Sequence, residues 1–92
     1  MRYLRAAAFK RAYRNLDPTR QSRADQTLLK LAEAFETGEI PRGLGIKPLQ
    51  HGIWEARSGL FDRILFRRAS ADLLELLLIG THDEIKRFLK HA

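Results

Sequence analysis

The stretch LLELLLIGTHDEIKRFLK, residues 73–90, contains two different hydrophobic patterns separated by one glycine. Residues 73–79 are apolar except for one glutamate, and such a short, nearly continuous apolar run is typical of a strand inside a sheet. After the glycine, Thr81 and Glu84 have the spacing of a capping box, which marks the first turn of a helix. The stretch therefore predicts a buried strand and a short amphipathic helix, with His82 at their junction.

Two further strands are expected before this run. Residues 53–57 and residues 62–68 both alternate between apolar and polar side chains, and Ser58 and Gly59 between them suit a turn. Strands that are joined by so short a turn pair in the antiparallel sense. We therefore expect three consecutive antiparallel strands in this half of the chain.

The first part of the chain predicts one strand and two helices. Residues 2–5 alternate as a short strand does, and an apolar stripe at helical spacing follows. Asp17 suits the N-cap and Pro18 the first position of a second helix, which ends at Gly38 in a left-handed conformation. The two apolar stripes predict an antiparallel helical hairpin lying on the sheet.

The order of elements is strand, helix, helix, strand, strand, strand, helix. This order predicts an α+β fold in which an N-terminal helical hairpin packs on a small antiparallel sheet. The 92 residues are enough for one hydrophobic core, so we expect a single domain over residues 1–92. Helices grouped on one face of the sheet leave its other face open in this prediction.

Charge and composition limit the classes of partner and site. The chain has 17 Lys and Arg residues against 11 Asp and Glu residues, a formal net charge of +6, which favours nucleic acid or an acidic protein segment as partner. There is no cysteine, and the three histidines lack metal-ligand spacing, so we expect no metal and no cofactor. No apolar run reaches the ~18 residues of a membrane span, and Met1–Arg5 lacks the apolar segment of a secretory signal. We expect a cytoplasmic protein that does not enter a membrane.

Strand alternation predicts which side chains stand on the open face of the sheet. If the apolar side chains pack under the helices, the arginines of the two middle strands point away from them. The residues expected around this face are Arg57, Arg63, Arg67, Lys47, His51 and His82. The alternative is an ordinary solvated face, because such faces always carry some charge.

Several of these residues also have a purely structural interpretation. His82 is either a helix-start residue or a group that exchanges a proton with a hydroxyl. Lys47 is alternatively a solvated loop lysine, and Asp62 a turn residue. The spacing of Trp54 favours the core, and Phe88 is either a core residue or a platform on which a base stacks.

Three stretches of the chain have a familiar form: IKPLQHGIWEAR at residues 46–57, DRILF at residues 62–66 and GTH at residues 80–82. Together with FKRAYRNL at residues 9–16, they resemble the RelE/ParE superfamily of bacterial toxins, most closely the branch that includes YafQ. The resemblance covers essentially the whole chain. It implies a RelE-like fold and a cognate antitoxin protein that wraps the toxin. Members of the RelE and YafQ type cut mRNA in the ribosomal A site without a metal, so the resemblance also implies mRNA and the ribosome as partners.

The resemblance implies roles for individual residues. His82 matches the histidine of the Gly-Thr-His ending in the YafQ-like branch, and Lys47 takes the position of the histidine in that branch's His-Pro-Leu motif. Arg57 matches a strand arginine that holds phosphate, and Asp62 falls near the acidic residue that opens the next strand. Phe88 lies where RelE has a tyrosine that stacks on the message.

Two departures from the family pattern bear on the site. The turn at residues 58–61 is short and lacks the histidine that the YafQ-like branch carries in this hairpin. Phe88 has no hydroxyl, so it can stack on a base but cannot transfer a proton.

The implied reaction is RNA cleavage, in which the ribose 2′-hydroxyl attacks its own phosphate. This reaction needs a base, an acid and cations near the phosphorus oxygens. We expect His82 and Lys47 as acid and base in either order, Arg57 and Arg63 as the phosphate clamp, and Asp62 as an orienting group. Together with Arg63, the expected RNA contacts are His51 and Phe88.

Two other functions stay open at this point. One is a ParE-like toxin that inhibits DNA gyrase and cuts no RNA; His82 and Lys47 argue against it, because that activity needs no acid–base pair. The other is an inactive homologue that only binds its antitoxin, and the shortened turn keeps this interpretation open.

Overall fold

The computed structural model describes residues 1–91 and contains five strands and three helices in those residues. In chain order they are β1 (Arg2–Arg5), α1 (Ala7–Arg14), α2 (Pro18–Thr37), β2 (Lys47–Pro48), β3 (Trp54–Ser58), β4 (Asp62–Ser70), β5 (Leu73–Thr81) and α3 (His82–Lys90). The α+β fold class is confirmed, and each predicted helix and strand is present. The structure adds the two-residue strand β2, which lies within the expected loop-to-strand segment.

The strands form one sheet in the order β1-β5-β4-β3-β2. Its four longer strands were expected to run antiparallel, but β1 runs parallel to β5, so the sheet is mixed. Alternation along a strand indicates which side chains share a face but carries no information about strand direction. The apolar strand β5 lies between β1 and β4, inside the sheet, as its sequence predicts.

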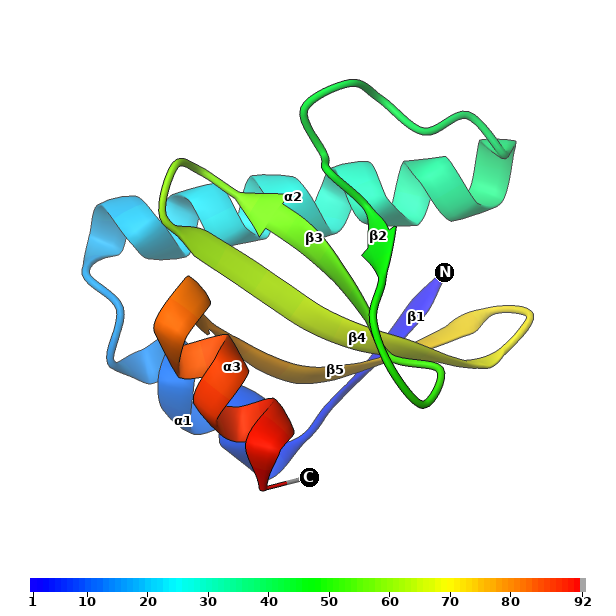
Figure 1. The fold of residues 1–92 in the computed structure, drawn as a ribbon. Coiled ribbons are helices and arrows are strands. Elements are labelled where there is room, and N and C mark those ends of the chain that lie inside the picture. Colours follow the sequence, from blue (N-terminus) through cyan, green and yellow to red (C-terminus); the bar gives the residue numbers. More distant parts are fainter. Residues whose placement is uncertain (92) are drawn as a thin grey trace.

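The two N-terminal helices cover one face of the sheet. The Oδ1 atom of Asp17 accepts a hydrogen bond of 2.9 Å from the backbone N–H of Arg20, so Asp17 caps α2 at its first turn. At the other end of α2, Gly38 adopts φ 77°, the left-handed conformation that ends many helices. Helix α1 packs on β5 and α2 on β3, so the two helices lie over different parts of the sheet (Figure 1).

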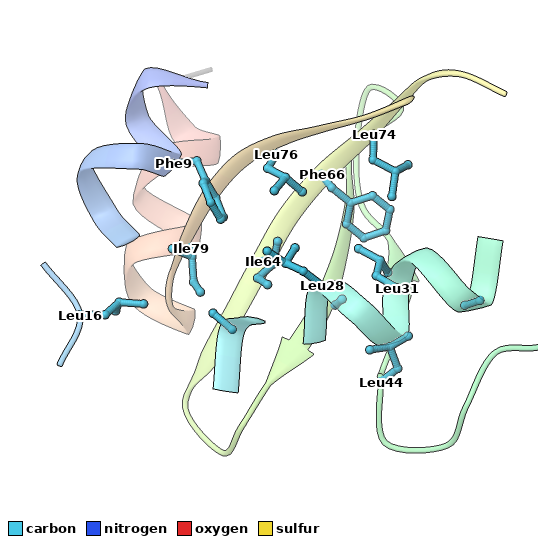
Figure 2. Packing of buried hydrophobic residues seen from close by; sticks show 13 residues of the cluster. Phe9, Leu16, Leu28, Leu31, Leu44, Ile64, Phe66, Leu74, Leu76 and Ile79 are labelled. Carbon is cyan, nitrogen blue, oxygen red and sulfur yellow. The ribbon is translucent and has the colours of Figure 1, made fainter. Parts of the chain in front are cut away.

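The main hydrophobic core fills the space between these helices and the sheet (Figure 2). Phe9 of α1 and Leu31 of α2 face Ile64 and Phe66 of β4, and all four side chains are almost fully buried. Trp54 shares their side of the sheet but stays 37% exposed, because it lies near the sheet edge beside the short strand β2. The predicted core face is therefore confirmed, with Trp54 at its margin.

A second, smaller cluster lies on the opposite face of the sheet. Leu65 of β4 packs there with Ile53 and with Ile85 of α3, and all three are buried. Helix α3 thus covers part of the face that the sequence predicted to be open, and Figure 1 shows α3 on one side of the sheet and α2 on the other. The apolar edge of α3 explains the difference, because such an edge gains stability only when it is buried.

Within residues 1–91, no helix is both long enough and apolar enough to cross a membrane.

Candidate functional site

The part of the second face that α3 leaves uncovered carries a group of charged side chains, Lys47, Glu55, Arg57 and Arg63, which we call the charged strip. Strand alternation places them there: Ala56 and Ile64 point into the main core, so the neighbouring residues point to the opposite face. The local sequence thus builds a strip of charge directly behind a hydrophobic core.

Arg57 and Arg63 are direct cross-strand partners in the antiparallel pair β3–β4. Side chains of directly paired residues lie on the same face with Cβ atoms about 5 Å apart, and two like charges in this position are destabilising. The backbone N–H of Arg57 also donates a 2.7 Å hydrogen bond to the carbonyl of Leu44, which fixes the strand here. This arginine pair is therefore a candidate site for an anion such as phosphate.

Glu55 is the buried member of the strip, with its side chain only 8% exposed. Its Oε1 atom lies 3.6 Å from the ammonium of Lys47, and its Oε2 atom lies 3.9 Å from Nε of Arg63. The Nε atom of Arg63 is buried and has no hydrogen-bond partner. The carboxylate thus lies between two cations of the charged strip, Lys47 on β2 and Arg63 on β4.

His82 lies at the first position of α3, beyond the end of β5, and is exposed. The hydroxyl of Thr81 and the side chain of Glu84 form the predicted capping box around this helix start. Arg57, Arg63 and Gly80 lie side by side on β3, β4 and β5, because Arg57 pairs with Arg63 and Arg63 pairs with Gly80. We call these three residues the arginine row. The exposed His82 thus follows Gly80, the β5 member of this row, by two residues in the chain.

Lys47 lies on the other side of this row from His82. It pairs with Glu55 on β2, whereas His82 follows β5, and the strands β3 and β4 lie between them. Since adjacent strands are about 4.8 Å apart, β2 and β5 are separated by about 14 Å across the sheet. Lys47 and His82 thus flank the arginine pair and do not touch each other.

Asp62 does not join the charged strip. Its side chain is 4% exposed and forms two hydrogen bonds with Arg20 of α2, from Nε to Oδ2 at 2.8 Å and from Nη2 to Oδ1 at 2.5 Å. This hydrogen bonding raises the pKa of the Arg20 guanidinium above its usual value. Asp62 therefore faces the N-terminal helices and connects α2 to the start of β4.

The remaining predicted RNA contacts lie at the borders of this face. Phe88 is half-buried against the second cluster and lines a hollow between α1, β5 and α3. His51 is exposed in the turn before β3 with φ 53°, and the amide of Gln50 beside it donates to the carbonyl of Leu89 in α3 at 3.5 Å. Arg67 is paired with Glu75. Within residues 1–91, none of these residues forms a hydrogen bond or ion pair with Arg57 or Arg63.

Sequence reasoning gave no role to Glu55, which the structure makes the centre of the ion-pair network. The available signal is its position: a glutamate on the same strand face as Arg57, between the apolar residues Trp54 and Ala56, is expected to need a charged partner.

No group of three or more His, Asp or Glu side chains in residues 1–91 is arranged to hold a metal ion.

No family model and no curated protein sequence matches the chain. Its fold is similar to solved structures at low sequence identity. The YoeB/ParE toxin from Agrobacterium tumefaciens is similar with a TM-score of 0.68 and 19% identity, over 89% of this chain and 99% of that one. The RelB–RelE antitoxin–toxin complex from Methanococcus jannaschii is similar with a TM-score of 0.66 and 17% identity, over 92% of this chain and 96% of that one. The DinJ–YafQ complex from E. coli is similar with a TM-score of 0.64 and 18% identity, over 92% of this chain and 98% of that one. The chain therefore has the RelE-like fold and matches the structures of the RelE, ParE and YafQ toxins.

Proposed function

We propose that this chain is the toxin of a type II toxin–antitoxin system and acts as a metal-free endoribonuclease on mRNA at the ribosome. The observation that carries the proposal is the direct pairing of Arg57 with Arg63, flanked by Lys47 on one side and His82 on the other. The similar YafQ and RelE structures support the toxin part of the proposal.

The chemistry divides among these four residues. The two guanidiniums hold the scissile phosphate and stabilise the charge that builds on its oxygens. His82 and Lys47 serve as general acid and base, one for the attacking 2′-oxygen and one for the leaving 5′-oxygen. These oxygens lie on opposite sides of phosphorus in an in-line attack, so the two groups need to stand on opposite sides of the arginine pair. Each proton transfer contributes about 10²-fold or more to the rate.

The other predicted catalytic residue has a different role in this proposal. Asp62 is engaged by Arg20 on the helix side, so we propose that it positions the start of β4 and does not touch RNA. Glu55 takes the orienting role, because it contacts both Lys47 and Arg63.

The experiment is inducible expression in bacteria with cleavage sites mapped on translated messages. The double variant His82→Ala with Lys47→Ala is expected to abolish cleavage and growth arrest. The matched control, Lys90→Ala with His91→Ala, removes the same two residue types from an exposed helix end and is expected to remain toxic. Unaffected messages with the wild type, or undiminished cleavage by the first double variant, contradict the proposal. Growth arrest with intact messages and inhibited supercoiling indicates a gyrase inhibitor instead.

We also propose an antitoxin as the protein partner, because two of the similar structures are toxin–antitoxin complexes. The net charge of +6 favours an acidic or amphipathic segment lying over the helices and the charged strip. Co-purification with the protein encoded by the adjacent reading frame, together with loss of toxicity on co-expression, tests this partner. If neither is observed, the partner is wrong.

A further inference from the structure

A basic hollow of about 260 Å³ lies beside the charged strip, between α2, the loop before β2 and the β3–β4 turn. Four cationic residues from three segments line it, Arg23, Lys30, Arg42 and Arg57, together with two polar residues, two glycines and one leucine. None of the lining residues is acidic. Within residues 1–91, none of these four side chains forms an ion pair, whereas six other cationic groups do, at Met1, Arg2, Arg20, Lys47, Arg63 and Arg67.

Four unpaired cations around one concavity repel one another and focus a positive potential. Such an arrangement costs stability in the free protein, and an anion removes the cost. Planar guanidiniums bind phosphate with paired hydrogen bonds, so a phosphate group is the anion that three arginines recognise best. The hollow therefore has the charge pattern of a phosphate site.

Two of the arginines that line the hollow, Arg23 and Arg57, pass close to glycines. A Cβ atom on Gly59 would lie 2.9 Å from Cδ of Arg23, and a Cβ on Gly45 would lie 3.3 Å from Cβ of Arg57. Both glycines have positive φ, 73° and 59°. Each arginine side chain thus passes close to the backbone of a glycine, where a larger residue would crowd it.

The β3–β4 turn adds a second feature next to the hollow. Leu60 and Phe61, directly after Gly59, are 83% and 73% exposed, so the turn presents an aromatic ring and an apolar side chain to solvent. Cations that follow a phosphate backbone, combined with an exposed aromatic side chain, are the features that bind single-stranded nucleic acid.

We infer that this hollow binds backbone phosphates of single-stranded RNA, with a base stacked on Phe61, at a place separate from the scissile phosphate. Arg57 borders both the hollow and the charged strip, so one strand can pass from the strip to the turn. The inference rests on the proposed function for the choice of RNA as polyanion. An acidic peptide offers carboxylates to the cations but has no base to place on Phe61, so RNA is the better fit.

The test measures binding of a labelled single-stranded RNA with 2′-O-methyl groups, which the protein cannot cleave. The triple variant Arg23→Gln, Lys30→Gln, Arg42→Gln is compared with Lys10→Gln, Arg11→Gln, Arg14→Gln, which removes the same charge from exposed positions of α1. The hollow variant is expected to bind about tenfold more weakly than the α1 variant. Its plot of log affinity against log salt is expected to be shallower by about 2, since each phosphate contact on a single strand contributes about 0.7. Phe61→Ala is expected to weaken binding about tenfold with an unchanged salt slope, because it removes stacking and no charge.

Binding of polyglutamate, an acidic peptide, is measured with the same variants. Three outcomes overturn the inference: equal RNA binding by the two triple variants, an unchanged salt slope in the hollow variant, or a hollow variant that binds polyglutamate more weakly but binds RNA as well as the wild type does. Thermal unfolding of all variants excludes misfolding as the cause. His82→Ala separates this inference from the proposed function, because it is expected to keep full RNA binding while losing cleavage. If cleavage is absent in the wild type but the hollow variant loses RNA binding, the proposed function fails and the inference stands.

Discussion

Arg57 and Arg63 face each other across β3 and β4 on the same side of the sheet, and the one carboxylate within ion-pair distance of either is Glu55, 3.9 Å from Arg63 among the described residues. A direct pair of like charges is unfavourable in a free antiparallel sheet. The pair becomes favourable when a phosphate lies between the two guanidiniums. The arginine pair is therefore expected to have opposite effects on the stability of the free protein and on RNA cleavage, and both effects can be measured.

Replacing Arg57 with glutamine is expected to leave the free energy of unfolding unchanged or to raise it by up to about 1 kcal/mol, because it removes cross-strand repulsion. The same change is expected to reduce mRNA cleavage on programmed ribosomes by about 100-fold or more, because it removes one phosphate donor. Urea denaturation and a cleavage assay measure the two effects. Arg67→Gln serves as the control, since Arg67 is paired with Glu75; it is expected to leave cleavage unchanged. A large loss of stability in Arg57→Gln would mean that the arginine pair has an internal partner.

Replacing Glu55 with glutamine is expected to lower the free energy of unfolding by about 1–3 kcal/mol, because the partly buried guanidinium of Arg63, whose Nε atom is buried, loses its nearest carboxylate. Lys47 also loses its partner, so cleavage is expected to fall in kcat more than in KM. Denaturation and steady-state kinetics provide the measurements. Glu75→Gln, which removes the more exposed carboxylate paired with Arg67, is expected to cost under 1 kcal/mol. Equal losses in the two variants would contradict a special role for Glu55.

The ion pair between Asp62 and Arg20 is expected to contribute to stability and not to RNA cleavage. Asp62→Asn is expected to destabilise the fold by about 2 kcal/mol, because it leaves the Arg20 guanidinium without its carboxylate partner. Arg20→Gln is expected to cost about as much, and the double variant less than the sum of the two, since both changes remove one interaction. Cleavage per folded molecule is expected to stay near the wild-type value. A loss of cleavage at full folding would restore Asp62 as a catalytic residue.

Gly80→Ala is expected to disturb the helix start that carries His82. A Cβ atom on this residue would lie 3.0 Å from Oε1 and 3.2 Å from Cβ of Glu84, whose carboxylate accepts the Thr81 N–H. The capping box then opens at a cost of about 1 kcal/mol. Cleavage is expected to fall further than stability, because His82 shifts with the helix. Thr81→Ala is the comparison variant, since it breaks the cap without crowding Glu84; similar effects of both would assign the loss to the cap alone.

The sequence was sufficient for most elements of the fold, because local signals specify them. The Asp17 cap, the left-handed Gly38 and the capping box at Thr81 each depend on a few neighbouring residues, and all three are present. Alternation also placed Arg57 and Arg63 on one face. What local patterns did not specify was long-range pairing: the parallel β1–β5 pair, the packing of α3 on Leu65, and the partners of Asp62 and Glu55. Alternation along a strand shows which face of the sheet a carboxylate points to only if the first residue of the strand is known. The cation that pairs with the carboxylate depends in addition on which element packs on that face.

The hydroxyl of Tyr3 provides a prediction about pH. It donates a hydrogen bond to the carbonyl of Leu28, and burial raises its pKa from about 10 to about 12. The neutral phenol is thus favoured in the folded state, so its contribution to stability is complete below pH 10. That contribution is lost as the pH rises from about 10 to about 12, because the unfolded chain ionises first; a pKa difference of about 2, at 1.36 kcal/mol each, corresponds to roughly 2.7 kcal/mol. In Tyr13→Phe, Tyr3 is the one remaining tyrosine. Its phenolate absorbance is expected to appear near pH 12 in the folded protein and near pH 10 in urea. Tyr3→Phe is expected to lose stability at pH 8 but to show a shallower decline above pH 10. Ionisation of Tyr3 near pH 10 in the folded protein would contradict its burial against α2.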